Sequence, residues 1–197
     1  MSQRSPLIYK GLRPLAVAGF GSIMRPKIIG RENIPKDGRV VIAGNHTKPF
    51  DVFMLFLSTR RCLHFLAKAE LFKGPLDKFF KAAGIIPVDR SRKNPEALNA
   101  AREYLNNESA VAIFPEGTTN KTDAVLLPFR MGAVKMARDT SSPIVPFTIS
   151  GAYKLTGPRP EIRFYPPFYV GDGDLEQENE KFRQFIYDNL VNKEKIS

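Results

Sequence analysis

His46 and Asp51 are the two side chains in this sequence whose types and spacing best suit proton transfer. They belong to the segment GNHTKPFD, residues 44–51, and four residues separate them. A backbone that folds back over this length can bring the carboxylate to one imidazole nitrogen. The other nitrogen is then free to accept a proton, as a general base does. The same spacing also suits a purely structural His–Asp pair, so alone it is a weak signal.

The sequence offers no enzymic nucleophile to accompany this base. No serine lies in a Gly-x-Ser-x-Gly segment, and Cys62, the only cysteine, has no recognisable activating partner. We therefore expect the substrate to supply the attacking group, for example a hydroxyl. His46 and His64 are the only histidines, so the sequence shows no metal-ligand spacing and we expect no bound metal.

Two other segments could bind an anionic substrate. Glu116, Gly117 and Thr118 lie in the run PEGTTNK, residues 115–121. Its backbone N–H groups and hydroxyls could hold an anionic oxygen, and Glu116 could accept a hydrogen bond from a substrate hydroxyl. Arg90 ends the run IIPVDR, and its guanidinium suits a phosphate monoester. The plainer alternatives are an ordinary surface turn and a surface Arg–Asp pair.

The elements that must position these residues alternate between β-rich runs and helical patterns. Strands are predicted over residues 39–43, 63–67, 85–88, 110–114, 144–149 and 161–165, and helices over 51–58, 75–83, 95–106, 131–138 and 172–192. This alternation predicts an α/β fold, a single layered domain with a largely parallel central sheet flanked by helices. Ligands bind such sheets beyond the carboxyl ends of the strands, where we expect the candidate residues to meet.

The length of 197 residues and the apolar fraction of 43% fit one such domain, which we place at residues 29–197. Residues 1–28 are predicted to form a basic amphipathic segment that precedes it. Its uncharged run, residues 14–24, is too short to span a bilayer, which needs about 20 residues. The segment suits an anchor at the membrane interface, and an ordinary helix packed on the core is an equal alternative.

The formal net charge of +10 is concentrated in the first half of the chain. Residues 1–93 carry 18 basic and 6 acidic side chains, whereas residues 94–197 carry 12 and 14. A basic face attracts anionic lipid, nucleic acid or an acidic carrier protein. The sequence has no zinc knuckle, RNP-type aromatic pattern or basic-zipper helix, which disfavours nucleic acid as the partner.

The order of the candidate segments is more informative than any one of them. His-x4-Asp begins at His46, Pro-Val-Asp-Arg ends at Arg90, Phe-Pro-Glu-Gly-Thr ends at Thr118, and Ile-Val-Pro ends at Pro146. Each lies at a predicted strand, and the intervening runs AKAEL and LPF fit the same pattern. Together they closely resemble the glycerolipid acyltransferase family, in particular the bacterial 1-acylglycerol-3-phosphate (lysophosphatidic acid) O-acyltransferases.

The resemblance implies roles for individual residues. His46 would be the general base and Asp51 the residue that orients it. The glycerol phosphate would be held by Arg90, Glu116, Gly117 and Thr118, with Lys68 as a further phosphate contact, and Pro146 would shape the acyl or thioester side of the cleft.

The resemblance also implies the reaction and its setting. A fatty acyl group would pass from acyl-CoA or acyl carrier protein, as co-substrate rather than bound cofactor, to the sn-2 hydroxyl of 1-acylglycerol 3-phosphate. The partners would be this lysophospholipid, an anionic membrane surface at the cytoplasmic face of the cell membrane, and an acyl carrier protein as a further candidate.

Two positions depart from the family pattern. Thr119 stands where family members usually carry an arginine after Gly-Thr, so Lys121 or Arg130 is expected to supply that charge. Lys48 stands where a serine is frequent. The acceptor headgroup is therefore open, and another lysolipid or glycerol phosphate is an alternative. From other classes, the alternatives are a basic nucleic-acid-binding module and a non-catalytic lipid-binding protein, the latter disfavoured by the presence of both His46 and Asp51.

Overall fold

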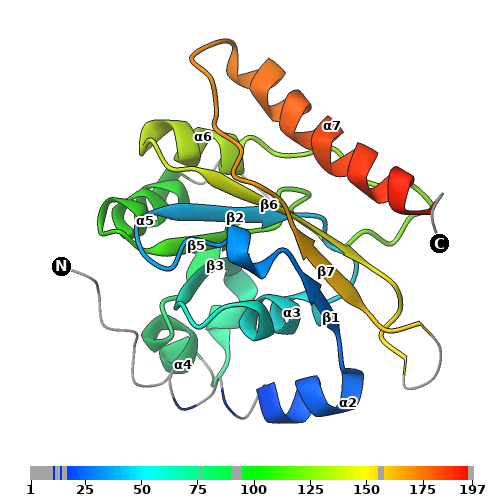
Figure 1. Ribbon diagram of the computed structural model, residues 1–197. Coiled ribbons are helices and arrows are strands. Elements are labelled where there is room, and N and C mark those ends of the chain that lie inside the picture. The colour runs from blue at the N-terminus through cyan, green and yellow to red at the C-terminus, as the bar shows by residue number, and fades with distance from the viewer. Residues whose placement is uncertain are drawn as a thin grey trace.

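A seven-stranded sheet with helices on both faces forms the framework of the protein in the computed structural model (Figure 1). The structure describes residues 11, 14, 17–75, 77–89, 95–154 and 158–194. The strands are β1 (Lys27–Ile29), β2 (Val40–Gly44), β3 (Leu63–Lys68), β4 (Ile86–Val88), β5 (Ala110–Ile113), β6 (Ile144–Ser150) and β7 (Glu161–Phe164). The α-helices are α2 (Ser22–Met24), α3 (Asp51–Ser58), α4 (Asp77–Ala82), α5 (Pro95–Asn106), α6 (Gly132–Asp139) and α7 (Leu175–Glu194). Shorter helical segments are η1 (Val17–Gly21), η2 (Arg31–Asn33) and η3 (Ala69–Lys73).

The sheet is mostly parallel, and its strand order is β1-β7-β6-β2-β5-β3-β4. From β4 to β6 every neighbouring pair is parallel. Strand β7 pairs antiparallel with β6, and β1 pairs parallel with β7. The predicted α/β fold with a largely parallel sheet is therefore confirmed. The carboxyl ends of the parallel strands β2 and β5, from which the His46 and Glu116 segments continue, lie at one edge of the sheet.

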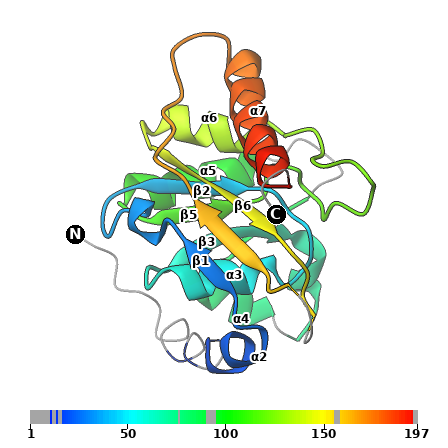
Figure 2. The ribbon, with the colours of Figure 1, turned by 45° about the vertical axis from the view of Figure 1, so that its right-hand side comes forward.

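Alternation along β2 shows how the sheet is buried on both faces. Val41 and Ala43 pack in a core cluster with α5, α6 and α7, whereas Val40 and Ile42 pack in a second cluster with α3. Figure 2 shows α6 and α7 on one side of the sheet and α3 on the other. Because a central parallel strand buries both faces, its sequence reads as a continuous apolar run, which is what VVIA shows.

Strand β1 was not predicted from the sequence. Its three residues pair with β7, Lys27 opposite Glu161 and Ile29 opposite Arg163. Three residues are too few to show a period of two, so only the tertiary partner identifies them as a strand. The strand crosses the position between residues 28 and 29 where we placed the start of the domain.

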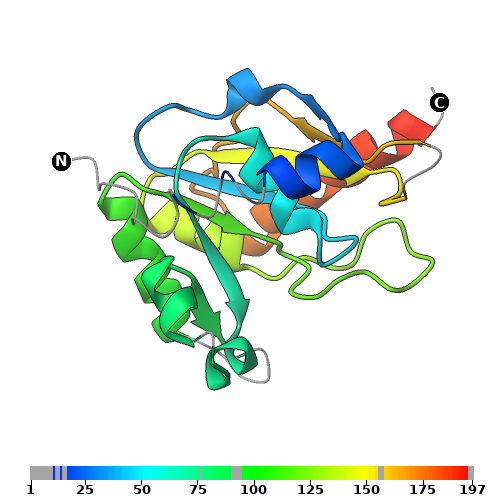
Figure 3. The same ribbon diagram turned by 90° about the horizontal axis from the view of Figure 1, so that it is seen from below.

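The described end of the N-terminal segment lies beside α3. Residues Val17–Met24 form η1 and α2, and Figure 3 shows them alongside α3. Most of the predicted amphipathic stretch lies outside the described residues. Among the helices that the structure describes, none is long and apolar enough to cross a membrane.

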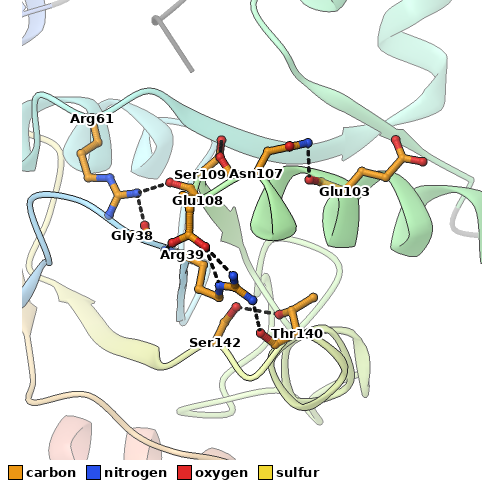
Figure 4. Close-up of polar contacts among 9 residues, drawn as sticks. All are labelled: Gly38, Arg39, Arg61, Glu103, Asn107, Glu108, Ser109, Thr140 and Ser142. Carbon is orange, nitrogen blue, oxygen red and sulfur yellow. Dashed lines mark hydrogen bonds and ion pairs between the residues drawn. The ribbon is translucent and has the colours of Figure 1, made fainter. Parts of the chain in front are cut away.

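Arginine side chains join the loops at the opposite edge of the sheet, the amino edge, where the amino ends of the parallel strands lie (Figure 4). Arg61, just before β3, donates to the carbonyl oxygens of Pro35 at 3.0 Å and of Asp37 and Glu108 at 3.3 Å, and to that of Gly38. Arg39 forms an ion pair with the Glu108 side chain. The loops that enter β2, β3 and β5 are thereby joined.

A cavity of about 1850 Å³ opens at this amino edge, among the segments that lead into β2, β3 and β5. Arg61 and Glu108 belong to its lining, and none of the candidate catalytic or substrate-binding residues does. Since the strands β2 and β5 are parallel, this cavity lies at the far end of the strands from His46.

Replacing Arg61 tests whether this network stabilises the fold. We expect Arg61→Ala to lower the free energy of unfolding by about 1–3 kcal/mol, because partly buried carbonyl groups lose their donor. Arg60→Ala removes an exposed neighbouring arginine and should change it by less than about 0.5 kcal/mol. Urea denaturation followed by circular dichroism measures both, and equal losses in the two variants would contradict the assignment.

Candidate active site

The predicted His46–Asp51 pair is present at the carboxyl end of β2. The Nδ1 atom of His46 lies 2.9 Å from Oδ2 of Asp51, and Asp51, the first residue of α3, is 0% exposed. A carboxylate can only accept, so the hydrogen of this bond is on Nδ1. The other ring nitrogen, Nε2, is then the unprotonated one and can accept a proton.

Two residues fix where β2 ends and where the loop between β2 and α3, which we call the His46 loop, begins. At Gly44 a Cβ would lie 2.1 Å from the carbonyl oxygen of Phe147, so only glycine allows β2 and β6 to approach this closely. Next to it, the buried Asn45 side chain accepts from the Ile149 N–H at 2.7 Å and donates to the Ile149 carbonyl at 2.8 Å. The loop therefore starts from a fixed point on β6.

Asp51 is surrounded by hydrogen-bond donors. Its Oδ2 accepts from the backbone N–H of Thr47 at 2.6 Å and of Lys48 at 2.9 Å, in addition to the His46 ring. Its Oδ1 accepts from the Thr47 hydroxyl at 3.2 Å and from the Tyr153 hydroxyl at 2.5 Å. A fully buried carboxylate needs such partners to remain charged.

The imidazole of His46 is held from a second direction by Phe114. The two rings stack with their centroids 4.0 Å apart and their planes 17° apart. The side chain of His46 is 12% exposed, so the ring is fixed in place and still reaches the surface. Stacking and the Nδ1 bond together leave the ring one orientation, in which Nε2 is the free nitrogen.

Glu116 binds the loops of the site together. Its buried carboxylate accepts from the His46 N–H at 2.6 Å and from the Leu127 N–H at 2.9 Å. Burial raises the pKa of Glu116, and the two backbone hydrogen bonds act in the opposite direction. Because each oxygen already has a donor within the protein, Glu116 positions the His46 loop. The substrate contact expected for it stays a prediction.

The glycine turn after β5 places Arg130 beside the site. Gly117 has a φ of 70°, and a Cβ there would lie 2.7 Å from Nε of Arg130. The Arg130 N–H donates to the Pro115 carbonyl at 2.8 Å, and the Asn120 N–H donates to the His46 carbonyl at 2.8 Å. The turn is therefore attached to the His46 loop and has a guanidinium against its glycine.

The other predicted site residues differ in their exposure to solvent. Thr118 is exposed in the same turn, and the exposed Lys68 at the end of β3 forms an ion pair with Glu70 at 3.2 Å. Pro146 is buried in β6 opposite Ala43 of β2. Arg90 lies outside the described residues. Across the described parts of the chain, no group of His, Cys, Asp or Glu side chains could hold a metal ion.

Sequence reasoning missed Tyr153. It follows the carboxyl end of β6 by three residues, at the edge where the site was expected, and that position is the only signal the sequence gives. No fixed spacing links it to Asp51, which is 102 positions earlier in the chain.

A family model gives the class to which this chain belongs. The model of the family described as "Acyltransferase" matches residues 25–150, which include the His46–Asp51 pair and the glycine turn, and the chain belongs to this family.

The relatives of this chain carry a more specific name. The 1-acyl-sn-glycerol-3-phosphate acyltransferase of Bacillus subtilis (strain 168) is 33% identical over 127 residues, covering 64% of this chain and 62% of the relative. The enzyme of that name from Saccharomyces cerevisiae is 34% identical over 138 residues, covering 68% and 45%. The chain thus matches less than two thirds of the length of either relative.

A solved structure shares the fold. The crystal structure of the 1-acyl-sn-glycerophosphate (LPA) acyltransferase PlsC from Thermotoga maritima superposes with a TM-score of 0.76 over 94% of this chain and 79% of that chain. The sequences are 23% identical, so this likeness establishes the architecture.

Proposed function

We propose that this protein transfers a fatty acyl group from a thioester donor to the sn-2 hydroxyl of 1-acylglycerol 3-phosphate, giving phosphatidic acid. The observation that carries the proposal is the buried Asp51 carboxylate on Nδ1 of His46, which leaves Nε2 as a base at the carboxyl edge of the sheet. Family membership and the names of the relatives support the choice of reaction and acceptor.

In the proposed mechanism His46 acts on the acceptor hydroxyl directly. Nε2 removes the proton as the hydroxyl oxygen attacks the thioester carbonyl carbon, and the carbon–sulfur bond then breaks. The imidazolium, stabilised by Asp51, returns its proton to the departing thiolate of CoA or acyl carrier protein. Direct transfer agrees with a sequence that has no serine in a Gly-x-Ser-x-Gly segment. The only cysteine, Cys62, is a poor nucleophile because burial raises the pKa of its thiol to about 11.

We propose that the acceptor phosphate binds at the glycine turn. Arg130 lies against Gly117, and this turn is bonded to the His46 loop through Asn120. The planar guanidinium of an arginine suits a phosphate monoester. We therefore propose Arg130 as the substitute for the arginine missing at Thr119, with Lys68 and Arg90 as further phosphate contacts.

We also propose that the protein works at an anionic membrane surface on the cytoplasmic face of the cell membrane. Ile23 of α2 and Phe50, which precedes Asp51, are 59% and 51% exposed. Phe20 of η1 stacks on both Phe50 and Phe53, so the described end of the N-terminal segment and the start of α3 form one apolar patch next to His46. The excess of basic residues in the first half of the chain would attract anionic lipid.

Replacing His46 tests the reaction. We expect His46→Ala to lower turnover about 10²–10⁴-fold, the contribution of a positioned general base. The assay follows phosphatidic acid formed from lysophosphatidic acid in mixed micelles, with acyl-CoA and acyl carrier protein offered separately, which identifies the donor. His64→Gln, which replaces the buried histidine of β3, is the control and should keep turnover.

Near-normal turnover by a folded His46→Ala variant would remove His46 from the mechanism. If the wild-type protein forms no product with either donor, lysophosphatidic acid is the wrong acceptor, and other lysolipid headgroups are to be assayed next.

Replacing Arg130 tests the phosphate site. We expect Arg130→Gln to raise KM for lysophosphatidic acid about tenfold or more with a smaller change in kcat, because a charge-assisted bond to phosphate contributes about 1.5–3 kcal/mol. Adding Thr119→Arg, which restores the family residue, should recover much of the affinity. Lys121→Gln is the matched control, and a larger effect there than at Arg130 would assign the phosphate to Lys121.

Replacing the exposed apolar residues tests the membrane surface. We expect the double variant Ile23→Ser, Phe50→Ser to bind vesicles of 30% phosphatidylglycerol at least about fivefold more weakly, because two side chains lose their burial in lipid. Tyr169→Ser removes an aromatic residue that is more exposed but lies between β7 and α7. Vesicle sedimentation should show no loss for this control, and equal losses would argue against a defined surface.

A further inference from the structure

Tyr153 connects the loop after β6 to the catalytic pair. Its hydroxyl donates to Oδ1 of Asp51 at 2.5 Å. Its ring packs against Phe20 at 6.0 Å and Phe50 at 5.9 Å between centroids. Since aromatic contacts with two neighbours fix the ring, the hydroxyl is held in position toward Asp51.

The two oxygens of Asp51 differ in how they are satisfied. Oδ2 accepts three bonds of 2.9 Å or less, from the His46 ring and from the backbone of Thr47 and Lys48. Oδ1 accepts from the Thr47 hydroxyl at 3.2 Å and from Tyr153. Tyr153 therefore provides the short hydrogen bond to Oδ1. Without it, this buried oxygen would keep only the longer hydrogen bond from the Thr47 hydroxyl.

We propose that Tyr153 is a positioning residue of the active site, whose hydroxyl fixes the orientation of Asp51 and limits how strongly its carboxylate holds the imidazolium of His46. This inference rests on the proposed function, in which His46 is the base. It adds a third member to the pair, contributed by the loop that follows β6, the strand beside β2 in the sheet.

The chemistry of the contact requires a neutral donor. Burial, followed by the nearby charge of Asp51, raises the pKa of Tyr153 well above its usual range, so the hydroxyl keeps its proton at every pH at which the protein is assayed. By donating, it draws part of the carboxylate charge away from His46. Removing the hydroxyl leaves that charge available to the imidazolium, which then persists to higher pH.

The hydroxyl of Tyr153 bonds Asp51, whereas the other charged groups near His46 have different contacts. Glu116 is bonded to the backbone of the His46 loop, Arg130 lies against Gly117, and the side chain of Lys48 is exposed. A change in the protonation of His46 would then report on the bond between Tyr153 and Asp51.

Tyr153→Phe tests the proposal because it keeps the ring and its packing and removes only the hydroxyl. Tyr165→Phe is the matched control, since the Tyr165 hydroxyl bonds the Thr148 hydroxyl at 2.9 Å, away from Asp51. The chain has only two histidines, so NMR signals of the imidazole rings can be followed against pH, with His64→Gln assigning them. The pH dependence of kcat is measured in parallel.

For Tyr153→Phe we expect the midpoint of the His46 titration to move to higher pH than in the wild-type protein. The acidic limb of the kcat profile should move with it, kcat at neutral pH should fall, and KM for the acceptor should stay near the wild-type value. Replacing the tyrosine by 3-fluorotyrosine at position 153 gives a stronger donor, and the midpoint should then move to lower pH.

An unchanged His46 titration in both position-153 variants would overturn the proposal, even if Tyr153→Phe lowers thermal stability, because a merely structural tyrosine would also do that. Failure of the proposed function is a separate result. In that case the wild-type protein forms no product with any acceptor, while the NMR titrations still decide whether Tyr153 acts on His46 through Asp51.

Discussion

The site depends on keeping the Asp51 carboxylate charged where no water reaches it. A buried carboxylate costs several kcal/mol unless its lone pairs find donors. Here the donors come from the backbone of the His46 loop, the Thr47 hydroxyl and, across the sheet edge, Tyr153. The loop must therefore wrap around its own aspartate, and this wrapping sets the spacing of four residues and directs the His46 ring.

The fold could be predicted because parallel β/α alternation leaves a strong trace in the sequence. Buried runs such as VVIA and AVAI predicted β2 and β5 to within one residue at each end, and α3 begins and ends where its pattern does. The strand that sequence reasoning missed, β1, has three residues and is a strand only because β7 lies beside it. Pairing across 134 positions, from Lys27 to Glu161, leaves no local pattern to read.

The candidate site was predicted in part. Contacts between residues close together in the sequence could be inferred, and contacts between distant residues could not. His46 and Asp51 lie close enough in sequence for their contact to be inferred, and the structure brings them together. Glu116 was expected to face the substrate, and its position between the N–H groups of His46 and Leu127 follows from a loop path that the sequence does not encode locally. Tyr153 reaches Asp51 only because β6 and β2 are neighbours in the sheet.

The charge of the hydrogen-bond donors around the acidic side chains matters as much as the number of those donors. At the amino edge Glu108 is paired with Arg39, and a guanidinium there cancels the charge as it joins the loops. At the carboxyl edge the donors to Asp51 and Glu116 are backbone N–H groups, hydroxyls and the His46 ring. A guanidinium in place of the Tyr153 hydroxyl could satisfy Asp51 equally well, but it would cancel the negative charge that, in the proposed mechanism, stabilises the His46 imidazolium. Neutral donors keep the carboxylate in place and leave its charge to act on His46.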